Sequence, residues 1–552
     1  MTGPAIFFHA DAIEGAGKDV VGRRSAGQSF LRGFLAHVPG DAVHVVTEDA
    51  KAARAFEETA QALGDMRPVR AYPLRGDADF TQAGTVFFPG PGYLGAGWRR
   101  QRFGADRCSL VGITHTVSTR RVIEGLHHLM LDPVEDWDAI ICTSRAVHSV
   151  VARQMEEEAA YIRDRFGATR VPVPQLPVIP LGIHAADFAP RDGMRAQMRD
   201  RFGAGDALVV MTMGRLTSIE KANPIPLFMA LERAAQRLGQ PVHLWLVGWP
   251  ARAEEEALHR DGAAAFAPSV QVQIIDGRDA QIRRDIWAGA DVFTLPVDNI
   301  QETFGLVPVE AMAAGLPVVM PDWNGFRDTV VHGRTGFLIP TRMIGAGHPV
   351  GEELARRFAA GTDGYLQHLS LMQQQTQIDV PAYADAFLAL GDADLRARMG
   401  RAGAAHVAQT FDWAAVIPQY LDLARELAAR RGTGAVRPPR NPTQIDPFAL
   451  YGRYPTETPD GDWIVTRRRT LDVAGLATLD RLNGRALYQR TMLPRARTVE
   501  FLDAVGAQGP LTIGAAAAAI GLRVDLAIGA ALFLAKYDYL TLARSEPNSG
   551  RN

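Results

Sequence analysis

The chain has 552 residues, which is too many for one hydrophobic core and predicts two to four domains. Hydrophobic residues make up 47% and charged residues 22%, the composition of an ordinary globular protein. The formal net charge of −2 excludes an overall electrostatic attraction to nucleic acid or to an anionic membrane, although it permits a local basic patch.

The number of cysteines indicates the cellular compartment in which the protein folds. The chain has two cysteines, Cys108 and Cys142, which we interpret as free thiols at or near buried strands. A secreted fold that depends on disulfides would carry more, so we expect a reducing cytoplasm. Residues 1–10 do not resemble a signal peptide, and the chain has no run of about 18 apolar residues, so we expect no membrane span. Association with the inner membrane surface stays open.

Short apolar runs alternate with segments of helical period over roughly the first 340 residues. Such runs are typical of parallel sheets covered by helices on both faces. Two series, divided near residue 190, predict two doubly wound α/β domains with a ligand site between them at the carboxyl ends of the strands. The first series is Ala5–Phe8, Val43–Val46, Thr85–Phe88, Leu110–Ile113, Ala139–Cys142 and Val178–Ile179. The second is Leu208–Met213, Val242–Val247, Val270–Ile275, Val292–Leu295, Pro317–Met320 and Gly336–Ile339.

The pattern changes after the second series. Residues 344–375 are rich in glutamine near their end and predict an inserted surface excursion, whereas 379–429 show helical periods. Residues 431–447 contain four prolines, two glycines and three arginines, which is typical of a linker. We therefore predict domains over 1–190 and 191–430, a linker over 431–447 and an accessory domain over 448–552.

The end of the accessory domain resembles a winged helix. Three short helical patterns, Thr498–Val505, Ile513–Ile520 and Val524–Lys536, precede an extended segment at 537–542. A DNA reader would place Arg, Lys, Asn or Gln on its third helix, but here that helix is almost entirely apolar. We therefore expect no DNA binding and interpret 448–552 as a region for protein docking or self-association.

The most informative segment of the chain is Glu302-Thr-Phe-Gly-Leu-Val-Pro-Val-Glu310, which follows a predicted strand and precedes a helix. Eight residues cover a little over two helical turns, so the two carboxylates could lie along one wall of a cleft. Gly305 permits a close approach of the backbone at the helix start, where free N–H groups and the helix dipole favour a pyrophosphate. Two solvated glutamates on an ordinary amphipathic helix are the alternative.

A second segment, Met213 to Lys221, lies where the first strand of the second series gives way to a loop. Arg215 offers a planar fork of donors and Lys221 a mobile point charge, which suit a diphosphate. Gly214 allows a sharp turn at the strand end. The alternative is a solvated basic loop.

Two further features lie in the first half of the chain. His115 follows the strand at 110–113, so it is placed to face the cleft between the domains, although a structural histidine is the alternative. The loop from Asp11 to Ala26 is glycine-rich and basic, and we expect a helix to begin after it, near Gln28. Its spacing fits neither a phosphate-binding loop nor a dinucleotide fingerprint, so we reject an ATPase or dinucleotide function.

With these features, residues 1–430 resemble the large retaining glycosyltransferase family, family four, of the GT-B fold. The resemblance implies a fold of two Rossmann-like domains that face a central cleft. It also implies a nucleoside diphosphate sugar as the donor. Further segments that carry the resemblance are Val178-Ile-Pro-Leu-Gly-Ile-His-Ala-Ala-Asp-Phe188, Trp137-Asp-Ala-Ile-Ile-Cys-Thr-Ser144, Glu310-Ala-Met-Ala-Ala-Gly-Leu-Pro-Val318 and His332-Gly-Arg-Thr-Gly-Phe-Leu338.

The resemblance also implies roles for individual residues. Arg215 and Lys221 resemble the pair that neutralises the donor diphosphate, and Glu302 resembles the acidic residue beside the transferred sugar. Glu310 resembles the residue that accepts hydrogen bonds from the ribose hydroxyls. His115 resembles a first-domain histidine that contacts the sugar.

Backbone groups have implied roles as well. The amides around Phe304, Gly305 and Leu306 would hold the distal phosphate. Either Gly27 or Gly22 would belong to the loop near the donor phosphates.

The chain departs from the family pattern after the strand near residue 320. Asn324-Gly325 stands where the family has two glycines, and Asp328 stands where it has glutamate. These changes leave the nucleotide site credible but bear on the geometry of the acceptor.

We therefore predict a metal-independent, retaining glycosyltransferase without a cofactor, acting on a carbohydrate, lipid-linked or other hydroxyl acceptor. The Asp-x-Asp triplets of the chain follow no predicted strand directly, so none of them resembles a metal clamp. One alternative keeps the fold as a phosphorylase or sugar synthase. Another is a catalytically silent protein that binds sugar nucleotides. The sequence does not identify the base, the sugar or the acceptor.

Overall fold

The computed structural model describes residues 3–9, 21–76, 78–433, 441–442, 444–483 and 493–544. The chain forms two compact units, Met1–Arg440 and Asn441–Asn552. The division between them lies inside the predicted linker.

The first sheet consists, within the described residues, of six parallel strands in the order β3-β2-β1-β4-β5-β6. Alternate residues of its strands enter two separate cores, with Phe7 on one face and Ile6 and Phe8 on the other, so helices cover both faces. The sequence did not predict β3, an edge strand whose side chains are only partly buried. The predicted strand at Val178–Ile179 is one bridge to Cys142. The strands are β1 (Ala5–Phe8), β2 (Val43–Thr47), β3 (Val69–Pro73), β4 (Thr85–Phe87), β5 (Ser109–Ile113) and β6 (Ala139–Ile141).

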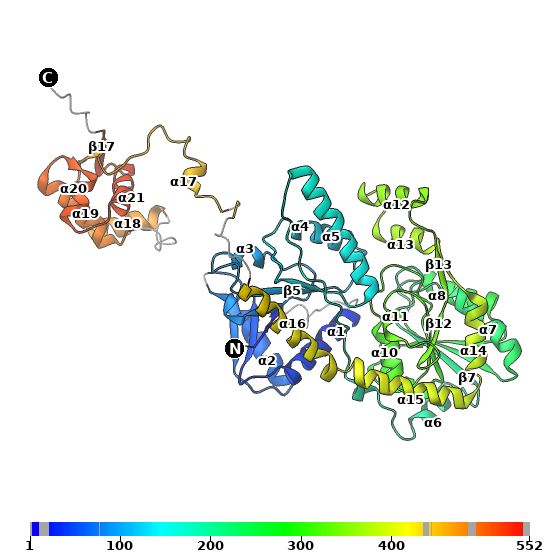
Figure 1. Cartoon of the computed structure of the whole chain (residues 1–552). Helices are drawn as coiled ribbons and strands as arrows, with labels where there is room; N and C mark the ends of the chain where they lie inside the picture. Colours follow the sequence, from blue (N-terminus) through cyan, green and yellow to red (C-terminus); the bar gives the residue numbers. More distant parts are fainter. Residues whose placement is uncertain are drawn as a thin grey trace. The chain divides into compact units, whose positions relative to one another are not determined.

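Helices connect these strands in the alternating pattern that parallel pairing requires (Figure 1). Several begin at polar caps; Ser144, for example, accepts a hydrogen bond from the Val147 amide at the start of α5. The helices are α1 (Val21–His37), α2 (Ala50–Ala62), α3 (Ala96–Arg100), α4 (Arg120–Leu129) and α5 (Arg145–Phe166), with 3₁₀ turns η2 (Phe80–Ala83) and η3 (Ala185–Phe188).

The second sheet also has six parallel strands among the described residues, in the order β12-β11-β10-β7-β8-β9. Every strand of the second predicted series is present. The strands are β7 (Leu208–Met213), β8 (Val242–Gly248), β9 (Gln271–Asp276), β10 (Val292–Thr294), β11 (Val318–Pro321) and β12 (Gly336–Ile339). Around them lie α6 (Met194–Arg201), α7 (Ile225–Leu238), α8 (Ala253–Phe266), α9 (Ala280–Asp285), η4 (Ile286–Gly289), α10 (Leu306–Ala313), α11 (Phe326–Thr329), α14 (Val380–Ala389) and α15 (Ala393–Thr410).

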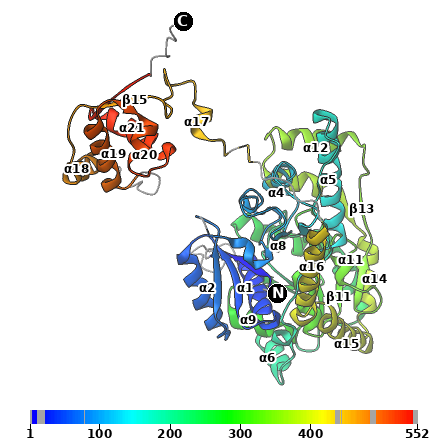
Figure 2. The same cartoon turned by 60° about the vertical axis from the view of Figure 1, so that its left-hand side comes forward.

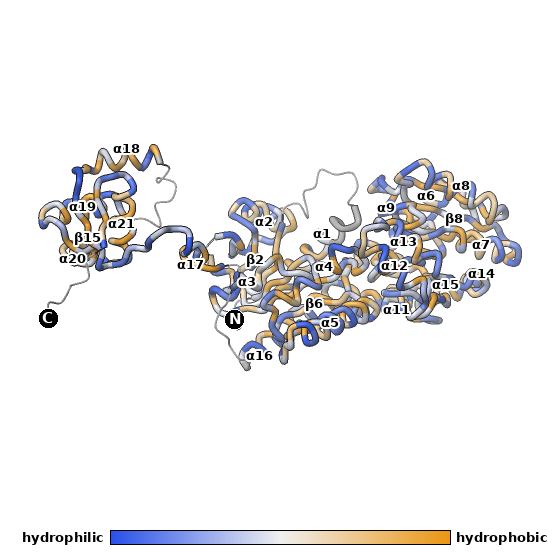
Figure 3. Tube along the Cα trace, turned by 90° about the horizontal axis from the view of Figure 1, so that it is seen from above, coloured by the Kyte–Doolittle hydropathy of each residue, from blue (hydrophilic) through white to orange (hydrophobic). Residues whose placement is uncertain are grey.

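The hydropathy of the chain follows this architecture. In Figure 3 the apolar residues gather along the strands, and apolar and polar residues alternate along the covering helices. Two parallel sheets covered by helices confirm the predicted α/β fold of two Rossmann-like domains.

The last helix of the first unit, α16 (Trp413–Thr433), packs on the first sheet, although the sequence assigned 191–430 to the second domain. The Trp413 indole donates to Ser29 Oγ at 2.9 Å. A Cβ atom on Gly33 or Gly182 would lie only 2.4 or 2.6 Å from the Trp413 ring, so these glycines make room for it. The helix therefore ties the two Rossmann-like domains together.

The predicted excursion at 344–375 is a helical hairpin on a two-stranded antiparallel ribbon. The hairpin leaves the second domain after β12 and stands on the side of α4 and α5, as Figure 2 shows. Not all of it is surface: Gln373 is buried, with only 4% of its surface exposed, which corrects the surface assignment of that residue. The elements are β13 (Thr341–Met343), α12 (Pro349–Ala359), α13 (Tyr365–Gln373) and β14 (Thr376–Ile378).

Within the described residues of the second unit, four helices pack against a three-stranded antiparallel sheet of order β16-β15-β17. The three predicted helices and the final strand are present. In the described residues, the central strand β15 comes before the helices in the chain. In the sheet it occupies the position that the second wing strand has in a winged helix. The elements are α17 (Pro447–Leu450), β15 (Ile464–Arg467), α18 (Val473–Asn483), α19 (Arg495–Gln508), β16 (Leu511–Thr512), α20 (Ile513–Ala519), α21 (Val524–Lys536) and β17 (Leu540–Ala543).

Membrane-spanning potential is weak in the described part of the chain. No single helix there has the length and apolarity to cross a bilayer; only α20 and α21 taken together pass that test, and they are bent by 111°. Most of the apolar surface of α21 enters the core of its own unit.

Candidate functional site

Two loops at the carboxyl edge of the second sheet form the centre of the site. Residues 214–222 follow β7, and residues 295–305 follow its neighbour β10. Asn299 Nδ2 donates to the carbonyls of Ile219 and Lys221, at 2.9 and 3.1 Å, and Gln301 Nε2 donates to the Glu220 carbonyl at 2.9 Å. Side chains of one loop therefore fix the backbone of the other.

The predicted charged residues meet across these loops. Lys221 Nζ lies 4.0 Å from Glu302 Oε2, and Arg215 Nη1 lies 3.4 Å from Glu220 Oε2. About a third of each cationic side chain is exposed, 32% for Lys221 and 34% for Arg215, so both can reach a ligand. Gly214 turns the chain out of β7 with a φ of +148°, as predicted.

The start of α10 offers backbone donors beside these charges. Within the described residues, the amides of Phe304, Gly305 and Leu306 donate no hydrogen bond, as expected for the first turn of a helix. Gly305 has a φ of +84°, and a Cβ atom there would lie 2.3 Å from the Phe326 ring. Only glycine tolerates both this positive φ and the closeness of the ring, so Gly305 is required where α10 begins.

Glu310 lies in the second turn of α10. Burial raises the pKa of its carboxyl from 4.5 to about 7. Among the described residues no side chain or backbone group donates to this carboxylate or pairs with it, unlike Glu302, which receives the amide of Thr303. A buried acceptor without a donor is suited to a ligand that brings hydroxyl groups.

The first domain contacts this edge through the residues that follow β5 and β6. Thr303 Oγ1 donates to the His115 carbonyl at 3.0 Å, and Ser144 Oγ donates to the Thr303 carbonyl at 2.8 Å. Asp328 accepts from the Arg145 amide at 2.6 Å. The exposed His115 is thereby brought close to Glu302, the neighbour of Thr303 in the chain.

The departures from the family pattern have a structural reason. Asn324 adopts a φ of +40°, in the left-handed region that asparagine tolerates better than most residues. Its side chain bonds to the Glu302 carbonyl and to the Gly325 amide. A Cβ atom on Gly325 would lie 2.5 Å from Phe304 Cα, so only the second glycine of the pair is required by space. Asp328 accepts a hydrogen bond from Arg145 and so joins the second domain to the first.

The glycine-rich loop that was predicted to lie near the donor falls mostly outside the described residues. Residues 10–20 lie outside the described part of the chain, as do the side chains of 21–26. The helix that follows begins at Val21, not near Gln28, so Gly27 lies inside α1 at an exposed position rather than in a loop. A contact of Gly27 or Gly22 with the donor stays a prediction.

Sequence reasoning missed several polar residues that organise the site. Asn299 and Gln301 hold the cationic loop, and Gln373 donates to Asp298 Oδ1 at 2.6 Å from the hairpin. Burial raises the pKa of Asp298 to about 7. The polar run Asp298-Asn-Ile-Gln-Glu302 directly after a buried strand could have indicated the role of Asn299 and Gln301. No pattern in the sequence indicated that Gln373, which is distant in the chain, reaches the same site.

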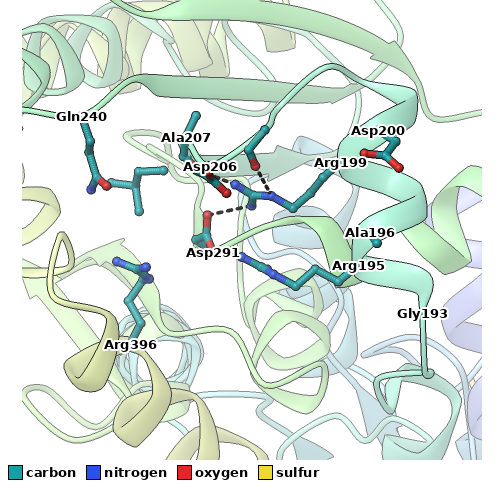
Figure 4. A pocket seen from close by; sticks show the side chains of 12 residues that line it. Gly193, Arg195, Ala196, Arg199, Asp200, Asp206, Ala207, Gln240, Asp291 and Arg396 are labelled. Carbon is teal, nitrogen blue, oxygen red and sulfur yellow. Dashed lines mark hydrogen bonds and ion pairs between the residues drawn. The ribbon is translucent and has the colours of Figure 1, made fainter.

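A separate hollow of about 610 Å³ lies at the amino edge of the second sheet, away from these residues (Figure 4). Its arginines already bond to the protein: Arg195 and Arg199 to Asp291, at 2.6 and 3.1 Å, and Arg396 to the Leu390 carbonyl at 2.6 Å. We interpret this hollow as structural.

In the described ranges, no three side chains of His, Cys, Asp or Glu converge as metal ligands do. Metal independence stays a prediction.

The fold and the site define a protein of the GT-B type: two Rossmann-like domains whose sheets meet at their carboxyl edges, with cations and a helix start on the second domain. Residues 207–346 match the profile of the family described as Glycosyl transferases group 1. The chain therefore carries a glycosyl transferases group 1 domain, which confirms the resemblance found in the sequence.

Two relatives share the same name, GDP-mannose-dependent alpha-(1-6)-phosphatidylinositol monomannoside mannosyltransferase. The one from Mycolicibacterium smegmatis is 32% identical over 208 residues, which are 36% of this chain and 53% of the relative. The one from Mycobacterium tuberculosis is 26% identical over 348 residues, which are 58% of this chain and 83% of the relative. The chain thus spans about half the length of the first relative.

Among solved structures, HepE from Anabaena in complex with UDP aligns with a TM-score of 0.48 at 17% identity. The alignment covers 77% of this chain and all of that one.

Proposed function

We propose that this chain is a retaining, metal-independent glycosyltransferase that moves a sugar from a nucleoside diphosphate sugar to an acceptor hydroxyl. The observation that carries the proposal is the contact of Lys221 with Glu302, with Arg215 on the same loop as Lys221 and free amides at the start of α10, directly after Glu302 in the chain. Positive charge and backbone donors at one place suit a diphosphate whose negative charge grows as the sugar leaves. The family domain over 207–346 supports the same reaction.

In this reaction the bond between the anomeric carbon and the diphosphate oxygen breaks, and the acceptor oxygen bonds to the same face of that carbon. The acceptor proton passes to the leaving phosphate, so we assign no residue as general base. Lys221 and Arg215 stabilise the leaving diphosphate, and Glu302 and His115 orient the sugar. The anomeric configuration of the product, read by NMR, tests retention; an inverted product would contradict it.

A thermal-shift screen with GDP-mannose and with UDP- and ADP-sugars tests the donor class. GDP-mannose comes first because both mycobacterial relatives are named for it. A ligand at 100 times its Kd stabilises the folded state by about 2.7 kcal/mol, which is easily measured. Release of nucleoside diphosphate on adding acceptor supports transfer. Dependence on inorganic phosphate would favour a phosphorylase, and binding without turnover would favour a silent sugar-nucleotide sensor.

The raised pKa of Glu310 predicts that donor binding depends on pH. Ribose hydroxyls that donate to its carboxylate favour the ionised form, so donor binding should lower the pKa of Glu310 from about 7 and release a proton. We expect about half a proton per donor bound at pH 7, and an affinity that rises with pH toward 7. Calorimetry in two buffers of different ionisation enthalpy measures the release.

The probe for that measurement is a nucleoside diphosphate sugar, because a free terminal phosphate itself titrates near pH 6, at a pKa of about 6. The control is Glu310→Gln, which should bind the donor more weakly and release no proton. Equal proton release in wild type and Glu310→Gln would show that another group titrates.

The second unit is proposed to serve docking or self-association rather than the donor reaction. All the predicted donor residues lie in the first unit, Met1–Arg440. A chain ending at residue 440 should therefore keep its nucleotide affinity while its acceptor use or oligomeric state changes. Light scattering and nucleotide titration on both chains measure this, and a loss of nucleotide binding on truncation would refute the assignment.

The names of the relatives suggest a broad class of acceptor for the proposed reaction. Both act, by name, on a mannosylated phosphatidylinositol, so carbohydrate and lipid-linked hydroxyl acceptors are the first to test. The two buried free cysteines agree with the expected cytoplasmic location, and contact with a membrane surface is part of this proposal.

A further inference from the structure

The helical hairpin at 341–378 belongs to the second domain but reaches the first. Its base is anchored by Gln373, whose amide nitrogen donates to the Ser218 carbonyl at 2.8 Å and to Asp298 Oδ1 at 2.6 Å. Both partners belong to the loops that carry Arg215, Lys221 and Glu302. The hairpin is therefore fixed directly to the proposed donor site.

The hairpin is also rigid within itself. Arg357 of α12 forms a bidentate pair with Asp363, at 2.8 and 2.6 Å, just ahead of α13. Phe358 stacks on His368 with ring centroids 4.2 Å apart, which joins α12 to α13. Together these contacts fix the position from which Tyr365, the first residue of α13, projects.

Tyr365 connects both domains through its hydroxyl. The oxygen lies 2.9 Å from Ser118 Oγ, in the loop after β5 that carries His115, and 3.1 Å from Gln301 Oε1, beside Glu302. The turn after α12 also lies near the first domain, since a Cβ atom on Gly361 would be 3.7 Å from a guanidinium nitrogen of Arg120 in α4. The hairpin thus joins the loop after β5 in the first domain to the loop after β10 in the second.

The direction of each hydrogen bond in this bridge is determined. Gln301 uses its amide nitrogen on the Glu220 carbonyl, so its oxygen must accept, and Tyr365 must donate to it. The Tyr365 oxygen then accepts from Ser118, whose own hydroxyl lies 3.1 Å from Thr116 Oγ1. Burial raises the pKa of Tyr365, which keeps the hydroxyl protonated as a donor. Bonds aligned in one direction strengthen each other.

We propose that Tyr365 is an interdomain positioning residue: its hydroxyl holds the His115 loop of the first domain against the donor loops of the second. This inference rests on the proposed transferase function. Tyr365 touches neither diphosphate-binding cation, so it acts on the alignment of the two halves and not on nucleotide affinity. Misalignment of reacting groups lowers turnover even when each group is intact.

The test compares Tyr365→Phe, Ser118→Ala and the double variant. Each single change breaks the hydrogen bond between Tyr365 and Ser118 that joins the hairpin to the first domain, so each should lower kcat for sugar transfer by about 5- to 50-fold, and the double variant should be no slower than Tyr365→Phe. The Kd for the nucleoside diphosphate should stay within about twofold of wild type, because the residues proposed to bind it are unchanged. The matched control is Tyr161→Phe on α5, since Tyr161 is 52% exposed and its hydroxyl makes no hydrogen bond to any described residue.

A second readout needs no substrate. Amide hydrogen exchange of the segments 114–119 and 299–304 should be faster in Tyr365→Phe than in wild type and unchanged in Tyr161→Phe. Unchanged kcat with unchanged exchange would overturn the proposal, as would multiplicative effects of the two single changes. A fall in nucleotide affinity in step with Tm would also overturn it, because that pattern indicates a structural role only. If the wild type transfers no sugar, the proposed function fails, and the exchange measurement still decides whether the bridge exists.

Discussion

Replacing Lys221 or Arg215 by alanine is expected to lower turnover by about 10²–10³ in each case, equivalent to about 3–4 kcal/mol of transition-state stabilisation. Both cations lie on one loop, held by Asn299 and Gln301, and neither is buried in a structural pair. Their side chains can therefore follow the charge that develops on the leaving diphosphate. Because this stabilisation grows in the transition state, kcat should fall more than donor affinity.

The measurement is steady-state release of nucleoside diphosphate, with Tm and circular dichroism recorded in parallel. Neither substitution should change the fold, since the two side chains are about one-third exposed and make only long ion pairs, at 3.4 and 4.0 Å. Lys51→Ala, on the outer surface of α2, is the matched control. Normal turnover in both Lys221→Ala and Arg215→Ala would remove the assignment of the diphosphate to this loop.

The sequence predicted the second sheet strand by strand, because each of its strands is a continuous apolar run bounded by turns. It missed β3, where Arg70 and partial exposure break that pattern. It also placed α16 with its neighbours in the chain, whereas Trp413 packs against Gly33 and Gly182 of the first domain. Periodicity identifies a helix and its apolar face but does not say which sheet that face meets.

The residues proposed to bind the donor were predictable because they too form local patterns in the sequence. Glu302, Gly305 and Glu310 lie within nine residues, and Arg215 and Lys221 within seven, so local spacing together with a strand end places them. Tyr365 and Gln373 reach the same cleft from a hairpin that begins about 40 residues after Glu302. Their arrival depends on tertiary packing, which no local pattern records.

Replacing Gly305 by alanine is expected to destabilise the first unit by about 2–4 kcal/mol. The positive φ of +84° costs a residue with a side chain roughly 1 kcal/mol or more, and the overlap with the buried Phe326 ring adds about 1–3 kcal/mol. Relief requires that Phe326 or the start of α10 move. The amides of Phe304, Gly305 and Leu306 would then shift, so donor affinity should fall together with stability.

Gly315 provides the control, because it has a similar φ of +82° but open space where its Cβ would lie. Gly315→Ala should show only the backbone cost, with donor affinity unchanged. The difference in unfolding free energy between the two variants, measured in urea, therefore isolates the contact with Phe326. Equal destabilisation by the two substitutions would show that the ring yields without cost, and that the glycine at the start of α10 is required only for its backbone conformation.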